Sequence, residues 1–435
     1  MRVEADAPVI LEAEVVVCGA GSAGLGAALA AARAGASVAL VERWPFFGGN
    51  ATAASLGSIC GLYVRVGDDN EFLSDGIARE WAEGLSAAGM GVGPVPYKDT
   101  AVMPYVPWGY KRLADRLIGA EPRITPLLHS FIAGVVRSAD AIDAVVIATK
   151  QGFRAVRGRV FVDATGDADI VYHAGAPWEM GGPGRLQYPS MQFYMQNADM
   201  QRAFAEMRTL ADKIHDAYES GAYSLTRSAG AAIPTMRGGE VIGAMTRVAK
   251  PDGNPPDGTD VFDLTEAEMR GRQIAEDAAR FLQSEIGGFE SAFLQDTAVT
   301  IGIRETRHAV GDHVVTFDEA IACTKHPDGV AASAWPFEFH TEGAETRWEH
   351  LPPGDWFEIP YRSLLARDVV NLLVAGRCVS ATHEALASSR VTGVCMAIGE
   401  AAGVAAAHAA SAGEATRDVD GTQLKKELVA SGALR

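Results

Sequence analysis

Apolar and polar positions near the N-terminus follow the order of a buried strand, a tight turn, a buried helix and a second buried strand. Glu14–Cys18 is a short β-branched run, and an alanine-rich stretch then reaches Ala32. Val38–Val41 gives another apolar run. Short apolar runs on either side of a helical stretch predict a βαβ unit buried in a parallel sheet. The uncharged stretch Val15–Ala32 contains four glycines, so it favours this unit over a membrane span.

The turn after the first strand predicts a dinucleotide site. Its first glycine suits the backbone angles of the turn, its second leaves room for a pyrophosphate, and its third lets the helix lie close to the strand. The free N–H groups at the N-terminus of that helix face the phosphates. We therefore expect cofactor contacts from Gly19, Gly21, Ser22, Ala23 and Gly24.

The residues at the end of the second strand indicate which dinucleotide is bound. Glu42 is placed to accept hydrogen bonds from ribose hydroxyls and would repel a 2′-phosphate, which disfavours NADP. The segment 43–52 resembles the part of two-dinucleotide-binding-domain flavoproteins in which a second glycine turn continues along the pyrophosphate and ribityl chain of FAD. The resemblance implies FAD rather than NAD, with contacts from Arg43, Gly48, Gly49, Asn50 and Ala51.

Further strands are expected to return the chain to the nucleotide domain. Leu127–Ser138 and Ala144–Thr149 have strand composition, and Gln151-Gly152 predicts a hairpin turn into another strand from Arg157. That strand ends in an Ala-Thr-Gly sequence, which resembles the late strand of FAD domains. Cofactor contacts are expected in this region from Val136, Ala164, Thr165, Gly166 and Asp167.

The pattern changes after about residue 175, where prolines and glycines interrupt it. Met191–Met195 opens a predicted separate unit, and Pro251–Thr259 predicts an exposed loop. A long amphipathic helix is expected over Glu266–Glu285, with Thr265 as its N-cap and Glu268 completing a capping box.

The last third carries the most specific resemblance, in Thr300–Arg307, Ile359–Leu365 and Asn371–Arg390. With the glycine turn, these segments resemble the FAD-dependent oxidoreductase family, a branch of the glutathione-reductase-like flavoproteins whose substrates are mostly unassigned. The ordered match runs from Val15 to Leu434 and implies a bound FAD and a redox reaction. It implies an α/β fold with a Rossmann-like FAD-binding domain, glutathione-reductase-like, over 1–175 and 361–435. A mixed α/β substrate domain is inserted mainly over 176–360, with 295–312 as a candidate return to the FAD domain.

The C-terminal strand and helix are predicted to reach the flavin end of the cofactor. A helix that begins at Thr392 can direct its N–H groups at the pyrimidine oxygen of the flavin, where negative charge builds up on reduction. The resemblance implies contacts from Gly376, Arg377, Gly393 and Val394. The alternative is a close-packed helix that contacts only protein.

Three side chains, His383, Arg390 and Cys60, are the main candidates for the chemistry. His383 can accept a proton from a substrate while a hydride goes to the flavin, or it can be a hydrogen-bonded structural histidine. Arg390 can hold a carboxylate or stabilise reduced flavin, or can pair with an acid, and Arg304 and Arg307 are further candidates for the same roles. Cys60 can be a covalent flavin anchor or a reactive thiol, but a buried, inert cysteine is the favoured interpretation.

Composition and charge narrow the classes of partner. The 435 residues are 48% apolar, and the net charge of −17 argues against nucleic acid and anionic membranes. Five cysteines without a C-x-x-C pair, and acids where an export signal carries basic residues, predict a cytoplasmic location. Ten histidines show no metal-binding spacing, so no metal is expected. We expect a small-molecule substrate and a possible homo-oligomer.

No second strand–glycine turn–helix unit follows residue 175, so a dedicated NAD(P)H domain is not expected. Oxygen, a quinone, a carrier protein or a second substrate remain as electron partners. The predicted reaction is oxidation of a small organic molecule by hydride transfer to FAD, by a dehydrogenase or oxidase, or the reverse reduction. A flavin-using non-redox or modification enzyme and a non-catalytic FAD-binding subunit remain alternatives.

Overall fold

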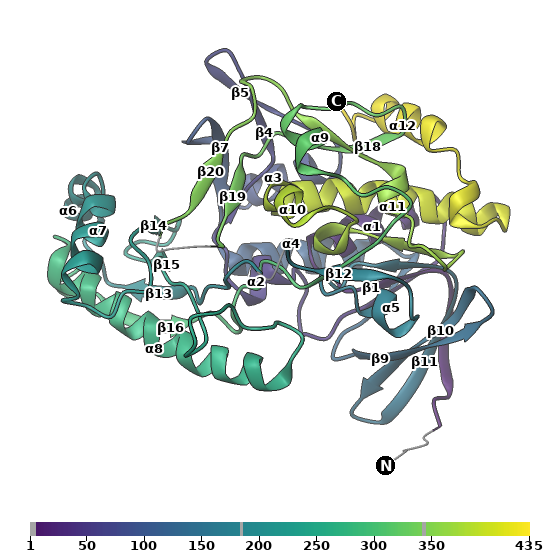
Figure 1. Ribbon diagram of the computed structural model, residues 1–435, viewed down its shortest axis with the longest axis horizontal. Helices are drawn as coiled ribbons and strands as arrows, with labels where there is room; N and C mark the ends of the chain where they lie inside the picture. Colours follow the sequence, from purple (N-terminus) through teal and green to yellow (C-terminus); the bar gives the residue numbers. More distant parts are fainter. Residues whose placement is uncertain (1–5, 183–185, 342–344) are drawn as a thin grey trace.

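The computed structural model of the protein describes residues 6–182, 186–341 and 345–435. Its largest sheet contains five parallel strands in the order β8-β2-β1-β11-β22 (Figure 1). The first half of β11 also pairs with the antiparallel strand β10, which in turn pairs with the antiparallel strand β9. The strands are β1 (Val9–Cys18), β2 (Val38–Val41), β8 (Ile124–Leu127), β9 (Phe131–Ser138), β10 (Ala141–Thr149), β11 (Gly152–Asp163) and β22 (Leu372–Val374). The predicted βαβ unit is therefore present, and the predicted strand over Leu127–Ser138 is the end of β8 followed by β9.

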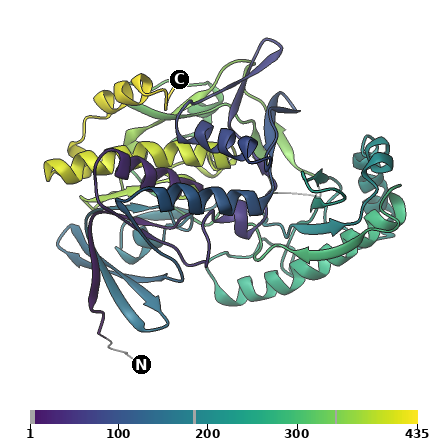
Figure 2. The ribbon, with the colours of Figure 1, turned by 180° about the vertical axis from the view of Figure 1, so that it is seen from behind.

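Two helices from opposite ends of the sequence pack on each other above this sheet. They are α1 (Ser22–Arg33) and α11 (Thr392–Ala412), which lie side by side in Figures 1 and 2. A Cβ atom added to Gly399 would lie 2.0 Å from the carbonyl oxygen of Ala23, so only glycine permits this approach. In the described part of the chain, α11 is the one helix long and apolar enough to cross a membrane, but 83% of its most apolar window is buried in the protein.

A second sheet forms its own layer at one side of the molecule. Its four antiparallel strands have the order β14-β15-β13-β16, and α6, α7 and α8 accompany them (Figures 1 and 2). Its buried residues, among them Phe193 and Phe281, form a cluster separate from the core around α1 and α11. The elements are β13 (Phe193–Gln196), β14 (Ala231–Pro234), β15 (Val241–Ala244), β16 (Phe293–Thr297), α6 (Met200–Glu206), α7 (Leu210–Ser220) and α8 (Val261–Glu285).

Small sheets and helices complete the fold. The paired strands are β3 (Ser58–Ile59), β6 (Val95–Tyr97) and β7 (Thr100–Pro104); β4 (Tyr63–Val66) and β5 (Asp69–Phe72); β12 (Trp178–Met180) and β17 (Arg307–Ala309); β18 (Gly329–Ser333) and β21 (Phe357–Pro360); β19 (Phe337–Phe339) and β20 (Arg347–Glu349). The remaining α-helices are α2 (Asn50–Ala53), α3 (Ile77–Ala87), α4 (Pro107–Ala120), α5 (Asp169–His173), α9 (Phe317–Ile321), α10 (His383–Ser389) and α12 (Gly421–Ala430).

The N-terminus of α8 differs from the expected one. The helix begins at Val261, and the Asp260 carboxylate caps it by accepting hydrogen bonds from the backbone of residues 262 and 263. Thr265 lies inside the helix and donates to the Val261 carbonyl, while Glu268 accepts from Thr300. The predicted cap and capping box are wrong because the helix begins at Val261, before Thr265. Val261 and Phe262 are 65% and 80% exposed, so the apolar residues of this first turn do not continue the buried face of α8.

The chain between β13 and β21 does not belong to one packing unit. Residues 315–359 bury their apolar side chains, including Trp335 and Phe357, in the core that contains α1 and α11. Residues 298–306 run from β16 to β17 alongside α2, and the Asn50 amide donates to the Ile303 carbonyl at 2.8 Å. The second sheet is thus joined to the nucleotide-binding layer through this crossing segment.

Candidate cofactor and substrate site

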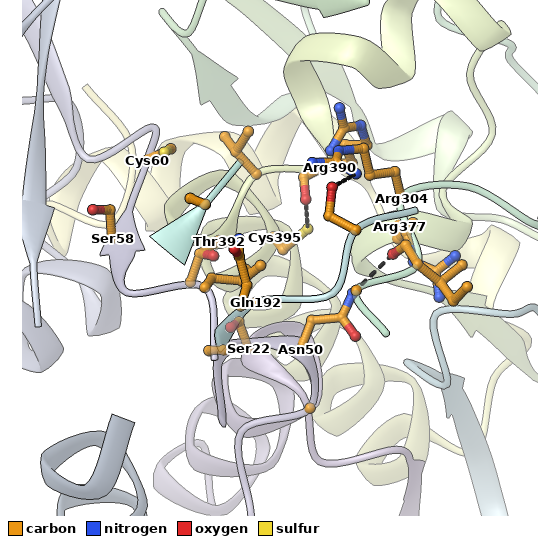
Figure 3. Close-up of a pocket in the computed structure, with 18 of the residues that line it drawn as sticks. Ser22, Asn50, Ser58, Cys60, Gln192, Arg304, Arg377, Arg390, Thr392 and Cys395 are labelled. Atoms are coloured by element: carbon orange, nitrogen blue, oxygen red, sulfur yellow. Dashed lines mark hydrogen bonds between the residues drawn. The ribbon is translucent and has the colours of Figure 1, made fainter. Parts of the chain in front are cut away.

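One cavity of about 1010 Å³ runs from the turn after β1 to the second sheet (Figure 3). It lies at the carboxyl ends of the parallel strands, which is where open α/β sheets bind ligands. Most of the residues expected at the cofactor, and two of the three candidates for chemistry, line it. They are Gly19, Gly21, Ser22, Ala23, Glu42, Arg43, Gly48, Gly49, Asn50, Ala51, Cys60, Ala164, Thr165, Gly166, Gly376, Arg377 and Arg390.

The glycines of the first turn have distinct steric roles. Gly19 has φ +93°, and a Cβ atom there would lie 2.4 Å from the Ala164 carbonyl oxygen. A Cβ on Gly24 would lie 1.8 Å from the Gly19 carbonyl oxygen, so Gly24 acts by packing and does not line the cavity. A Cβ on Gly21 would meet only the Gly49 Cα, at 3.8 Å. Gly21 therefore keeps the cavity itself open, while the other two allow the strand and helix to close on each other.

Glu42 joins the turn to the cavity. Its carboxylate accepts hydrogen bonds from the backbone N–H groups of Ala20 at 2.7 Å and Trp44 at 2.9 Å. Burial raises the pKa of Glu42, and these two donors offset part of the rise. The Ser130 N–H donates to the Glu42 carbonyl, which brings the start of β9 to the same end of the cavity. Glu42 is thus a fixed acceptor positioned for ribose hydroxyls.

Asp167 lies behind the cavity wall and orients Arg377, which is part of it. Its carboxylate accepts from Arg377 at 2.7 Å and from the Thr306 hydroxyl at 2.8 Å, and Arg43 lies 3.7 Å away. Burial alone would raise the pKa of Asp167, but Arg377 and Arg43 bring it below its ordinary value. Asp167, ionised at neutral pH, holds Arg377 and Arg43 at one edge of the cavity, where two cations face the cofactor end.

Val136 and His383 are not brought into the cavity. Val136 lies on β9, which starts beside Glu42 but runs away from it, and its side chain is 46% exposed. His383 is buried at the start of α10, where its Nδ1 lies 2.7 Å from a carboxylate oxygen of Glu305. Glu305 also accepts from the Gln187 N–H at 3.0 Å. This pairing fits a hydrogen-bonded structural histidine, the alternative given above.

Gly393 and Val394 pack next to cavity residues. The Gly393 N–H donates to the Cys60 carbonyl, and a Cβ there would lie 2.9 Å from the Gly61 carbonyl oxygen. Their neighbour Thr392 lines the cavity, so the N-terminal turn of α11 faces it. Cys60 lines the cavity as a free thiol, and burial followed by the nearby Glu338 raises its pKa. Because the thiolate is the nucleophile, Cys60 is suited to an inert role.

The far end of the cavity contains charged and aromatic residues that the sequence analysis did not single out. They include Tyr97, Arg227, Trp335, Glu338 and Trp348. They come from loops and short strands far apart in the chain, and no local motif marks them.

Glu338 and His340 form a hydrogen-bonded pair at this end. His340 Nε2 lies 2.9 Å from the Glu338 carboxylate, and the Thr346 hydroxyl is 3.4 Å from His340 Nδ1. Burial alone would raise the pKa of Glu338, but His340 and Arg390 bring it down to about 2. Burial and Arg304 hold the pKa of His340 well below its ordinary value. Glu338 is therefore ionised at neutral pH and accepts a hydrogen bond from His340 Nε2.

One group in the described residues has the composition of a metal site. The ligand atoms of His313, Glu319 and His326 lie within 4.8 Å of one another. Their sequence spacing matches no metal motif, which is why the sequence did not reveal them. The same Glu319 oxygen that faces His313 accepts from the N–H and hydroxyl of Thr316 in a capping box at α9. None of the three lines the cavity, and the absence of a bound metal stays a prediction.

The parallel sheet, the glycine turn at its carboxyl edge and the second glycine turn that contacts it define a dinucleotide-binding protein of the flavoprotein class. The chain belongs to the FAD dependent oxidoreductase family, whose sequence profile matches residues 14–428. FAD is therefore its cofactor, as predicted. The open path past Gly21, the acceptor Glu42 and the cations at the phosphate end fit that group.

Several solved structures are similar to this chain at low identity. A geranylgeranyl bacteriochlorophyll reductase-like protein from Thermoplasma acidophilum has 13% identity and a TM-score of 0.47, over 97% of this chain and 83% of that one. OxyS anhydrotetracycline hydroxylase from Streptomyces rimosus has 14% identity and a TM-score of 0.44, over 97% and 65%. The flavin-dependent brominase Bmp2 has 14% identity and a TM-score of 0.45, over 96% and 83%. No curated protein sequence matches the chain.

Proposed function

We propose that the protein is a glutathione-reductase-like flavoenzyme that transfers a hydride between a small organic substrate and FAD, as a dehydrogenase or oxidase or in the reverse direction. One observation supports this most directly. The cavity that contains the dinucleotide turns continues without interruption into an end lined by Tyr97, Trp335 and Arg304. A small molecule at that end would share one continuous cavity with the cofactor, which is the arrangement that a direct hydride transfer needs.

FAD supplies the hydride acceptor or donor. The protein contributes an electrostatic setting through α11, whose 21 residues begin at Thr392 in the cavity wall. The N-terminus of a helix carries partial positive charge, which favours negative charge on a reduced cofactor. Trp335, which is 1% exposed, gives the far end of the cavity an apolar wall.

Glu338 is assigned a positioning role and not that of the general base. A carboxylate with a pKa of about 2 holds protons too weakly to remove one efficiently at neutral pH. Its contacts instead fix neighbouring groups: it accepts from His340, and its backbone carbonyl accepts from Arg390 at 3.3 Å. We also infer that the electrons leave to oxygen, a quinone, a carrier protein or a second substrate, because no second dinucleotide motif follows residue 175.

Anaerobic mixing of FAD-loaded protein with candidate substrates tests the proposal. The expected result is that one substrate bleaches the flavin absorption band, and that admitting oxygen or a quinone restores it. Photoreduction of the same sample is the control, because it shows that the bound flavin accepts electrons. A photoreducible flavin that no member of a broad panel of alcohols, amines, acids and enones reduces would contradict hydride transfer. Turnover with no external electron acceptor would favour the non-redox alternative.

A further inference from the structure

Three arginines from distant parts of the sequence converge on the far end of the cavity. Arg227 precedes β14, Arg304 lies in the segment that crosses from β16 to β17, and Arg390 follows α10. All three line the same cavity, and Figure 3 shows Arg304 and Arg390 beside each other in its wall. Arg377, the arginine at the cofactor end, is already paired with Asp167 and is not part of this group.

The three guanidinium groups have neutral partners and spare donors. Arg304 donates through Nη1 to the Tyr188 carbonyl at 2.6 Å and the Ser190 hydroxyl at 2.9 Å. Arg390 donates through Nη2 to the Gln187 side chain at 2.9 Å, and Arg227 through Nη2 to Thr346. Among the described residues, the buried Nε atoms of Arg227 and Arg390 have no hydrogen-bond partner. Arg227 is only 8% exposed, so water offers it little compensation.

Positive charge exceeds negative charge in this group. Among the described residues, Glu338 is the carboxylate that acts on all three arginines, and it also accepts a hydrogen bond from His340. Glu305 acts on Arg390 and is already hydrogen-bonded to His383. Burial, followed by Arg390 and Arg227, lowers the pKa of Arg304 to about 9. Three other charged lining residues, Lys98, Asp212 and Glu345, are exposed, so solvent screens them. The buried cations therefore repel one another, and a bound anion would relieve that repulsion.

The walls beside the arginines suit an apolar body. The rings of Tyr97 and Trp335 stack with their centroids 6.1 Å apart, and Trp348 packs against both at an edge. All three aromatic residues line the cavity. A pocket with apolar walls and a few convergent polar groups is typical of a small-molecule site in which the polar groups fix the orientation.

We propose that the substrate is an organic anion whose carboxylate, or phosphate ester of the same charge type, is held by Arg227, Arg304 and Arg390, with an apolar or aromatic body against Tyr97 and Trp335. Planar guanidinium groups bind both carboxylate and phosphate in a bidentate manner. This inference rests on the proposed function, because it assigns the far end of the cavity to the substrate.

Titration of FAD-loaded protein with benzoate, phenyl phosphate and benzamide tests the inference, with the flavin absorption spectrum as readout. Benzamide has the shape of benzoate without its charge. Benzoate or phenyl phosphate is expected to bind at least tenfold more tightly than benzamide, and the tighter of the two identifies the anionic group. Arg227→Gln and Arg304→Gln should each weaken the anion about ten- to hundredfold and leave benzamide within about twofold. Arg202→Gln is the matched control, because Arg202 forms an exposed ion pair with Glu290. It should change neither the affinity for the anions nor the affinity for benzamide.

Two outcomes would overturn the inference. In one, the anions bind no better than benzamide, or none of the three probes binds. In the other, the arginine variants lose FAD or its reducibility while anion affinity is unchanged, which would assign the arginines to the cofactor. The comparison of the three probes needs no variant, so a variant that fails to fold does not remove the test. Anion binding without reduction by any substrate would contradict the proposed function and support the inference, whereas reduction by neutral substrates alone would do the reverse.

Discussion

Replacing Gly21 with alanine should weaken FAD binding without weakening the fold. Gly21 has φ −70° and ψ −173°, which alanine adopts without strain, and an added Cβ would meet only the Gly49 Cα, at the ordinary contact distance of 3.8 Å. Nothing in the protein therefore opposes the methyl group. It would instead occupy the space that the cavity leaves for the cofactor phosphates.

The expected magnitude follows from the cost of overpacking. Forcing one extra methyl group into a close contact costs about 1–3 kcal/mol, which is roughly a 5- to 150-fold loss of affinity. The Kd for FAD, measured by flavin fluorescence with the apoprotein of Gly21→Ala, should rise within that range. The unfolding free energy of the apoprotein, measured by thermal unfolding, should fall by about 1 kcal/mol or less, since the substitution is at an N-cap.

Gly24→Ala is the matched control for this experiment. The same methyl group on Gly24 would lie 1.8 Å from the Gly19 carbonyl oxygen, so it should destabilise the apoprotein itself. The two substitutions, three residues apart, should thus separate an effect on the ligand from an effect on the fold. If Gly21→Ala binds FAD as tightly as the unchanged protein, the phosphates do not pass Gly21 and the assignment of this end of the cavity is refuted.

Three further predictions concern charge and packing. Glu338 has a pKa of about 2, below its ordinary 4.5, so it contributes stability that is fully present above pH 4.5 and is lost as the pH falls toward 2. In denaturant unfolding measured over a pH series, Glu338→Gln should reduce this acid-dependent loss of unfolding free energy by up to about 3 kcal/mol. An unchanged loss at acid pH would contradict the assigned pairing. His383→Asn leaves Glu305 without its buried partner, so it should lower the melting temperature, while the rate of flavin reduction by substrate stays within a few-fold of the rate of the unchanged protein. A large loss of rate in a stable variant would restore His383 as a base. Gly399→Ala should cost at least about 1–3 kcal/mol of unfolding free energy because its Cβ would lie 2.0 Å from the Ala23 carbonyl oxygen. Gly119→Ala is the control and should not destabilise the protein, because the space around Gly119 is open. Equal melting temperatures of the two variants would show that α1 and α11 pack differently.

Local sequence identified the cofactor end of the site well. Gly19, Gly21 and Glu42 lie within a single βαβ unit, where a few neighbouring residues determine both the backbone path and the contacts. The second glycine turn was found in the same way, and a Cβ on Gly49 would lie 2.9 Å from the Gly21 Cα, which shows how closely the two turns meet. A local motif of this kind determines both the backbone conformation and the positions of its ligand contacts.

The other end of the cavity was only partly accessible from the sequence, which offered Arg304 and Arg390 as candidates but not Arg227 or Glu338. Arg227 and Glu338 lie more than 100 residues apart and meet only through the packing of the two layers. His383 stood next to a motif that resembles a flavin-contacting turn, but the side chain turns toward Glu305, which the sequence does not reveal. The predicted cofactor contact from Val136 is wrong because only the first residues of β9 reach the cavity. Long-range contacts of this type need the tertiary structure.

The packing of α11 on α1 also has a consequence for how the protein is made. The cofactor end of the cavity needs Gly19 from the first strand–helix turn and both Gly376 and Thr392 from near the other end of the sequence. A ribosome must therefore have synthesised the chain at least through Thr392 before a complete FAD site can form. Contacts between such distant segments also slow folding. Until α11 has been synthesised, the alanine- and glycine-rich surface of α1 lacks the helix that covers it, so FAD can bind fully only after synthesis has passed both helices.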